Sequence, residues 1–187
     1  MKHLRKQIAG YLLTLILLMV GIVFPGSEEK VLASGGSMTV HFLDVGQGLS
    51  ILVQSEGQNL LYDGGPRSAS SYVVSYLQEQ NVSEIDYLIS SHYDEDHVSG
   101  LIGCLNAFQV DNVIGADYIH DSSLYGSFMD AVAAHGLEVQ HPAVGAEYTF
   151  GSGEFTILSP KEISKESNAN SCLLYTSPSP RDRTRSR

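Results

Sequence analysis

Seven consecutive residues, Ser91-His92-Tyr93-Asp94-Glu95-Asp96-His97, carry the side chains of this chain that are best suited to chemistry. Alternate side chains of an extended loop share a direction, so we expect His92, Asp94 and Asp96 to converge on one side. His97 is expected in the first turn of the following helix, pointing elsewhere. Imidazole and carboxylate groups are the usual ligands of catalytic zinc, manganese or iron. The spacing therefore predicts two adjacent metal ions, one held by His92 and Asp94 and the other by Asp96 and His97.

Two other interpretations of this loop remain open. It could be a solvated acidic turn, in which the charges face water and bind nothing. It could also be a calcium loop, although calcium sites use oxygen ligands rather than flanking histidines. The metal-centre hypothesis is favoured because a buried strand and a helix flank the loop.

Other titratable side chains lack a ligand partner at useful spacing. The three further imidazoles in the second half of the chain are therefore interpreted as surface or helix-end residues: His120, His135 and His141. Cys104 shares an apolar helix face with Leu101 and Leu105, which predicts a buried free thiol rather than a nucleophile. The turn Gly46-Gln47-Gly48 is interpreted as a tight turn near the metal pocket.

The elements that must position the loop can be read from hydrophobic periodicity. Strands are expected over residues 38–44, 49–54, 59–62, 85–90, 112–115, 138–140, 147–150 and 155–158. Helices are expected over residues 98–108 and 122–135, with an earlier one, capped by Ser68 or Ser70, that carries Tyr72, Val73, Tyr76 and Leu77 on one face. Hairpins followed by strand–helix units predict a mixed sheet layered with helices, in the α/β (α+β) class.

Four motifs follow one another along the chain: His41-Phe42-Leu43-Asp44-Val45-Gly46-Gln47-Gly48, Leu61-Tyr62-Asp63-Gly64-Gly65, Ser91–Gly100, and Leu158-Ser159-Pro160 with Asn168-Ala169-Asn170-Ser171. In this order they resemble the metallo-β-lactamase superfamily, and within it the hydrolase domain of ComEC-type competence (DNA-uptake) proteins. The resemblance covers nearly all of residues 38–171.

The resemblance implies an αββα sandwich with a two-metal site at the sheet edge that activates water for hydrolysis. It assigns His92 and Asp94 to the first metal, with Asp94 standing where many members have histidine. It assigns Asp96 and His97 to the second metal, Asp96 also to orientation of the attacking water as the catalytic residue, and Asp63 to holding the loop in place. Two divalent ions are implied, Zn²⁺ first, with Mn²⁺ or Mg²⁺ as alternatives because a carboxylate hardens the first site.

The chain departs from the family pattern in three respects. Leu49 stands where this group usually has an acidic residue, and Ser99 where glycine is common. The third departure is that the later bridging Asp and the final His, which the resemblance places in the second half of the fold, have no counterpart here. In their place the segment 172–187 resembles the translation of a transposase-type sequencing adapter. We therefore expect a domain over 34–171 that is the first half of the fold only, followed by a non-native tail. The intact gene product is expected to be an enzyme, and the chain as written to show negligible hydrolysis.

The first 33 residues have the pattern of an export signal. Basic residues precede an uncharged apolar run over residues 8–24, and Val31-Leu32-Ala33 offers a small-residue cleavage pattern. The run is also long enough for an uncleaved membrane anchor. In either case the rest of the chain is expected outside the cytoplasm, with membrane contact only through this segment.

Charge limits the partners. The chain has a net charge of −10, and the segment 34–171 has 18 acidic residues against only Arg67, Lys161 and Lys165. Such a domain is poorly suited to gripping long nucleic acid. The expected function is that of an exported metal-dependent hydrolase acting on a phosphodiester, in the manner of a nuclease. The alternatives are hydrolysis of a cell-wall phosphodiester or a lactam, and an inactive binding module with the same fold.

Overall fold

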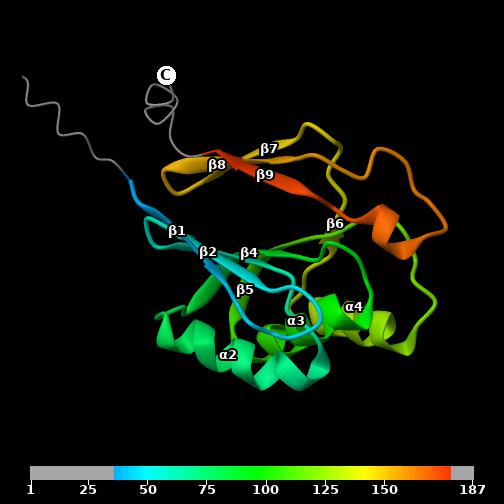
Figure 1. Cartoon of the computed structure of the whole chain (residues 1–187), viewed down its shortest axis with the longest axis horizontal. Coiled ribbons are helices and arrows are strands. Elements are labelled where there is room, and N and C mark those ends of the chain that lie inside the picture. Colours follow the sequence, from blue (N-terminus) through cyan, green and yellow to red (C-terminus); the bar gives the residue numbers. More distant parts are fainter. Residues whose placement is uncertain (1–35, 178–187) are drawn as a thin grey trace, which may run out of the picture. The chain divides into compact units, whose positions relative to one another are not determined.

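The central strands carry apolar residues at successive positions, and these point alternately to the two faces of one sheet. Both faces of that sheet are therefore buried. The computed structural model describes residues 36–177, all within a unit that begins at Gly35. In this part of the chain one sheet has the order β1-β2-β3-β4-β5-β6 and a second has the order β7-β8-β9 (Figure 1). The strands are β1 (Met38–Phe42), β2 (Ile51–Ser55), β3 (Gln58–Tyr62), β4 (Glu84–Ile89), β5 (Gln109–Ile114), β6 (Val139–Gln140), β7 (Glu147–Phe150), β8 (Gly153–Ile157) and β9 (Leu174–Ser177).

Along the first sheet the strands are joined first by hairpin-like connections and then by helices, as the sequence predicts. β1, β2 and β3 pair antiparallel, β1 and β2 through the loop over residues 43–50 and β2 and β3 through a short turn, whereas β3, β4, β5 and β6 pair parallel. Helices provide the crossovers between the parallel strands: α2 (Ser70–Glu79), α3 (Glu95–Ala107) and α4 (Ser123–Ala134). This mixed sheet with flanking helices confirms the predicted fold class. Its parallel strands bring the segments that follow β3, β4 and β5 to one edge of the sheet.

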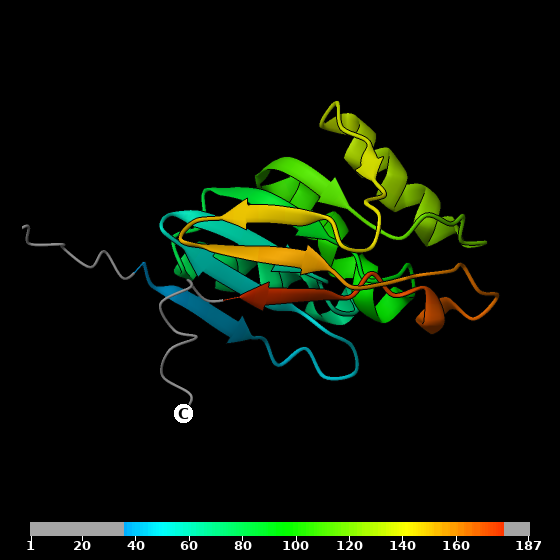
Figure 2. The same cartoon turned by 90° about the horizontal axis from the view of Figure 1, so that it is seen from above.

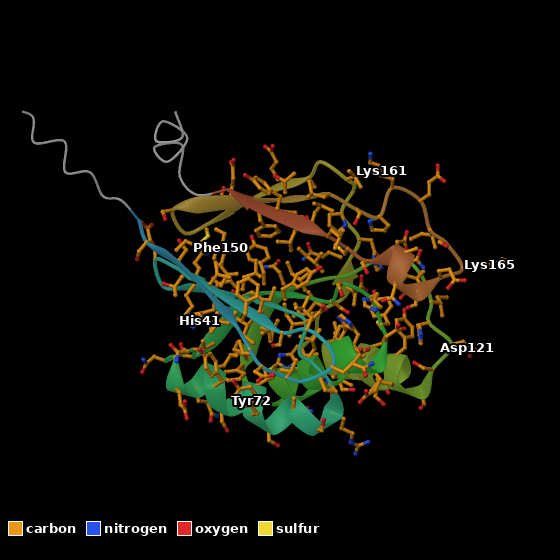
Figure 3. All side chains as sticks on the ribbon, in the orientation of Figure 1. His41, Tyr72, Asp121, Phe150, Lys161 and Lys165 are labelled. Atoms are coloured by element: carbon orange, nitrogen blue, oxygen red, sulfur yellow. The ribbon has the colours of Figure 1, made fainter. Side chains whose placement is uncertain are left out.

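Two cores sandwich the first sheet. Leu52, Leu61 and Leu88 face the helices, while their neighbours Val53 and Leu60 face the second sheet. This is the two-residue period of a β-strand with both faces buried. The second sheet covers the face opposite the helices (Figures 1 and 2). Its Phe150 points into the space between the sheets (Figure 3).

Three local predictions differ from the structure. α3 begins at Glu95 rather than Val98, so Asp96 lies inside the helix and not in an extended loop. α2 begins after Ala69 with no side-chain cap, so neither predicted serine caps it. Tyr72, expected on the buried face of α2, is 44% exposed. The hydrophobic stripe of α2 is narrower than predicted, and its fully buried residues are Val73 and Leu77.

The segment after Ser171, which we had excluded from the domain, contributes to the fold. Cys172 is buried in the core between the sheets, and its backbone N–H donates to the Ser91 carbonyl at 2.6 Å. β9 pairs antiparallel with β8, with Ile157 opposite Leu174. Leu174–Ser177 therefore form a strand, although the segment was expected only to be a tail that follows the domain. Whether the tail is native stays a prediction, as does the boundary at residue 171.

The expected export segment, 1–33, lies outside the described residues. Among the described residues, no helix has the length and hydrophobicity of a membrane span.

Thiol reactivity gives a direct test of this packing. Burial raises the pKa of Cys104 to about 12. Burial and the nearby Asp63 carboxylate raise the pKa of Cys172 to about 11. We expect neither thiol to react with iodoacetamide at pH 8 in the folded chain, and both to react in urea, as measured by mass spectrometry. Rapid labelling of Cys172 without denaturant would show that the segment after Ser171 does not pack as described.

A pair of helical glycines gives a second test. A Cβ on Gly100 of α3 would overlap the carbonyl oxygen of Gly64, whereas a Cβ on Gly126 of α4 meets no atom within 4 Å. We expect Gly100→Ala to lower the free energy of unfolding by about 1–3 kcal/mol through overpacking. Gly126→Ala should raise it by about 0.5–1 kcal/mol because alanine is the better helix former. Urea denaturation measures both, and the same sign for the two variants would contradict the close contact at Gly100.

Candidate metal centre

A buried carboxylate lies beneath the loop that the sequence singled out. Asp63 follows β3 with a φ of 57°, in the left-handed region that aspartate tolerates better than most residues. Its side chain is fully buried. The Oδ1 atom accepts the Ser91 backbone N–H at 2.8 Å, and Oδ2 accepts the Ser91 hydroxyl at 2.6 Å and His97 Nδ1–H at 2.8 Å. Asp63 thus fastens both ends of the loop to the end of β3.

These bonds also fix the protonation of the two histidines. The single Ser91 hydroxyl proton goes to Asp63, so Ser91 Oγ must accept from His92 Nδ1, 2.9 Å away. His97 likewise donates its Nδ1 proton to Asp63. When neutral, both imidazoles therefore leave the Nε2 lone pair free. His92 Nε2 is buried and has no hydrogen-bond partner among the described residues. A buried nitrogen with a free lone pair is what a metal ligand requires.

The carboxylates of the loop lie beside these nitrogens. Asp94 Oδ2 is 3.4 Å from His92 Nε2, and Asp96 Oδ1 is 3.9 Å from His97 Nε2. The predicted pairs are thus the neighbouring ones. His97 does not point elsewhere, as the sequence suggested, because its ring centroid lies 4.1 Å from that of His92. The helix places Asp96 and His97 in its first turn, which turns both side chains back toward the loop.

The surroundings of the two imidazoles shift their pKa values in opposite directions. Burial, and then the neighbouring His97, lower the pKa of His92, which favours its neutral form. For His97, burial acts to lower the pKa, but the hydrogen bond to Asp63 and the Asp63 charge outweigh it and raise the pKa. The side chain that presents the unpartnered nitrogen is therefore the one that stays neutral more readily. A neutral imidazole is the form that binds a metal.

The donor set is incomplete as it stands. Within residues 36–177, no three side chains of His, Cys, Asp or Glu are arranged so that they could hold one metal ion. The four predicted ligands are gathered as two adjacent pairs rather than as one closed cage. Their roles as ligands, and that of Asp96 in catalysis, stay predictions.

One histidine makes a contact that the sequence interpretation did not predict. His120, expected to have no ligand partner, has its Nε2 atom 3.2 Å from Asp94 Oδ1. His135 and His141 instead contact the backbone carbonyls of Leu105 and Gly115. Ser167, in the 3₁₀ turn η2 (Ser167–Asn170), also donates to Asp94 Oδ1, at 2.7 Å. Spacing along the chain gave no signal for either contact, since His120 and Ser167 lie 26 and 73 residues from Asp94.

Leu49 and Ser99, the two residues that depart from the family pattern, both lie beside the loop. Leu49 exchanges backbone hydrogen bonds with the Asp96 carbonyl and the Gly65 N–H, at 3.4 and 2.8 Å. Gly48, just before it, has a φ of 123° and no room for a Cβ against the Asp96 carbonyl. This confirms a tight turn beside the loop. Ser99 is nearly buried and donates to Glu95 one turn earlier. Nothing in the structure explains the preference for these side chains.

The fold and this loop together define a class of protein. The family model of the metallo-beta-lactamase superfamily matches residues 43–163. The chain belongs to this superfamily, which confirms the resemblance seen in the sequence. Members of the superfamily bind divalent metals, often zinc or iron. Membership supports a hydrolase-like role for the domain.

Two curated relatives are a recombination protein and a competence protein. The chain is 29% identical over 141 residues to recombination protein 2 of Haemophilus influenzae, covering 72% of this chain and 16% of the relative. It is 37% identical over 86 residues to competence protein ComA of Neisseria gonorrhoeae, covering 46% of this chain and 12% of the relative. The chain therefore spans less than a fifth of each relative.

Solved structures with a similar arrangement include two metallo-β-lactamases. One, SMB-1 bound to 2-mercaptoethanesulfonate, has a TM-score of 0.49 and 17% identity, with 64% of this chain and 49% of that chain covered. The other, from Cronobacter sakazakii, has a TM-score of 0.44 and 14% identity, with 59% of this chain and 45% of that chain covered.

Proposed function

We propose that this domain belongs to an exported metal-dependent hydrolase that cleaves a phosphodiester bond. The observation that carries the proposal is the buried, unpartnered Nε2 atom of His92, 3.4 Å from Asp94 Oδ2. An orphaned buried nitrogen costs free energy unless something binds it. The histidine and aspartate pairs therefore have the chemistry of a divalent-metal site, and each would supply two of the ligands that an ion needs. His92 and Asp94 would hold one ion, and Asp96 and His97 a second.

The chemistry divides between the ions and the chain. Divalent ions, when bound, would lower the pKa of a water molecule and offset charge on a phosphate. The chain's own contribution is orientation. Asp63 holds His97 through Nδ1 and, through Ser91, holds His92 as well, and the centroids of the two imidazole rings lie 4.1 Å apart. Asp96 is partly exposed, so water could reach its carboxylate and give up a proton to it.

The negative charge of the domain restricts the class of substrate. The segment 34–171 carries 18 acidic residues and three basic ones, which opposes long contacts with nucleic acid. A short phosphodiester is the better substrate because only one phosphate needs to reach the proposed metal site. The names of the relatives, a recombination protein and a competence protein, support a phosphodiester over a lactam. The export segment over residues 1–33 supports a location outside the cytoplasm, either secreted or anchored to the membrane.

The test is hydrolysis of bis(p-nitrophenyl) phosphate by the protein encoded by the intact gene, with Zn²⁺, Mn²⁺ or Mg²⁺ added in turn. We expect turnover that depends on the metal and disappears with a chelator. A chromogenic cephalosporin serves as the lactam control. Turnover of the cephalosporin alone would replace the phosphodiester with a lactam. Inactivity with every metal on both substrates would favour a binding module.

A further inference from the structure

Asp94 is the one loop carboxylate held by residues from two other parts of the described chain. Its Oδ1 atom accepts from Ser167 Oγ at 2.7 Å and lies 3.2 Å from His120 Nε2. His120 belongs to the connection between β5 and α4, and Ser167 to η2. These contacts leave Oδ2 as the oxygen that faces His92 Nε2.

The directions of these hydrogen bonds follow from their partners. Tyr118 Oη accepts the backbone N–H of Tyr93 at 3.2 Å and lies 2.9 Å from Ser167 Oγ. Because the Ser167 proton goes to the carboxylate of Asp94, Tyr118 must donate its own proton to Ser167. The chain of bonds therefore runs in one direction and ends on Asp94 Oδ1.

The His120 ring is fixed in the same way. Ser122 is the N-cap of α4 and accepts the Tyr125 backbone N–H at 3.2 Å, so its hydroxyl proton is free for His120 Nδ1, 2.8 Å away. The proton of a neutral His120 then lies on Nε2, which donates to Asp94 Oδ1. Two donors satisfy one oxygen of Asp94 and none of these contacts uses the other.

We infer that His120 and Ser167 are positioning residues that clamp Asp94 by Oδ1 and so present Oδ2, beside His92 Nε2, to a divalent cation. The inference rests on the metal site of the proposed function. A carboxylate stands at this position, where the family resemblance implies histidine in many members. A carboxylate can rotate to exchange its oxygens, so it needs partners that select one of them.

The test is titration of the 187-residue chain with Co²⁺ alone, following the visible absorption of the bound ion and its dissociation constant. We expect His120→Ala to weaken binding by about 10-fold or more, the range found when a partner of a metal ligand is removed. His120→Gln keeps an N–H donor near the position of Nε2 and should restore binding to within about 3-fold. The matched control is His141→Ala, because His141 contacts the Gly115 carbonyl and not the loop.

A double-mutant cycle separates positioning from a general structural role. In an Asp94→Ala background, His120→Ala should have no further effect, because the carboxylate that it holds is gone. Ser167→Ala should behave like His120→Ala in both backgrounds. An equal loss with and without Asp94, or wild-type affinity in His120→Ala, would overturn the inference. Absence of Co²⁺ binding by the wild-type chain would overturn the metal site itself, and the inference with it.

Discussion

Replacing His92 by alanine is expected to remove metal binding from this domain. His92 supplies a buried nitrogen whose lone pair no other described group uses. Loss of a direct ligand should cost more than the loss of a partner to one, so we expect the dissociation constant for Zn²⁺ to rise by more than about 100-fold. Competition with a chromogenic chelator measures this constant. Hydrolysis by the intact gene product should fall with it.

The control for this prediction is an imidazole elsewhere in the fold. His141→Ala removes a histidine that also lies at the end of a parallel strand but contacts only the Gly115 carbonyl and, at 3.9 Å, Asp117. Its affinity for Zn²⁺ should equal that of the wild type. Equal affinities for His92→Ala and wild type would show that the unpartnered nitrogen of His92 does not bind metal.

Asp63→Ala is expected to be the most destabilising substitution in this part of the chain. It removes a buried acceptor and leaves the Ser91 N–H, the Ser91 hydroxyl and the His97 Nδ1–H without their partner. Breaking a buried charged network of this kind costs about 3–5 kcal/mol. Alanine also tolerates the φ of 57° poorly. The free energy of unfolding in urea, measured without metal, gives the loss.

Asp63→Asn keeps the measurement possible if the alanine variant does not fold. Asparagine tolerates the left-handed backbone and still accepts the Ser91 N–H, but its amide group faces two donors. We expect an intermediate loss of about 1–3 kcal/mol, the cost of leaving buried donors unpaired. A loss below about 1 kcal/mol for Asp63→Ala would contradict the role of Asp63 as the anchor of the loop.

Most of the first sheet could be predicted because its signal is local. Residues such as Leu52 and Val53 alternate between two buried faces, and turns separate the strands, so periodicity identifies them. The position of the metal loop was also predictable, since it lies between a largely apolar strand and a helix. The motif Asp63-Gly64-Gly65 pointed to the end of β3, although not to the three hydrogen bonds that Asp63 accepts there.

The remainder depends on contacts between distant segments. His120 and Ser167 reach Asp94 only because the β5–α4 connection and η2 lie next to the loop in the fold. The early start of α3 was missed because charged residues in a first turn look like loop, although acidic groups there are favoured by the helix dipole. β9 was missed because residues 172–187 were interpreted as a non-native tail, whereas Leu174–Ser177 pair with β8.

The central claim is that a divalent ion binds at His92 Nε2. Anomalous diffraction from crystals of the protein grown with Zn²⁺, collected at the zinc absorption edge, tests it most directly. We expect an anomalous peak at a bonding distance of about 2.0–2.2 Å from His92 Nε2, with Asp94 Oδ2 as a second ligand. A crystal that contains zinc only at other positions, with His92 Nε2 unliganded, would contradict it.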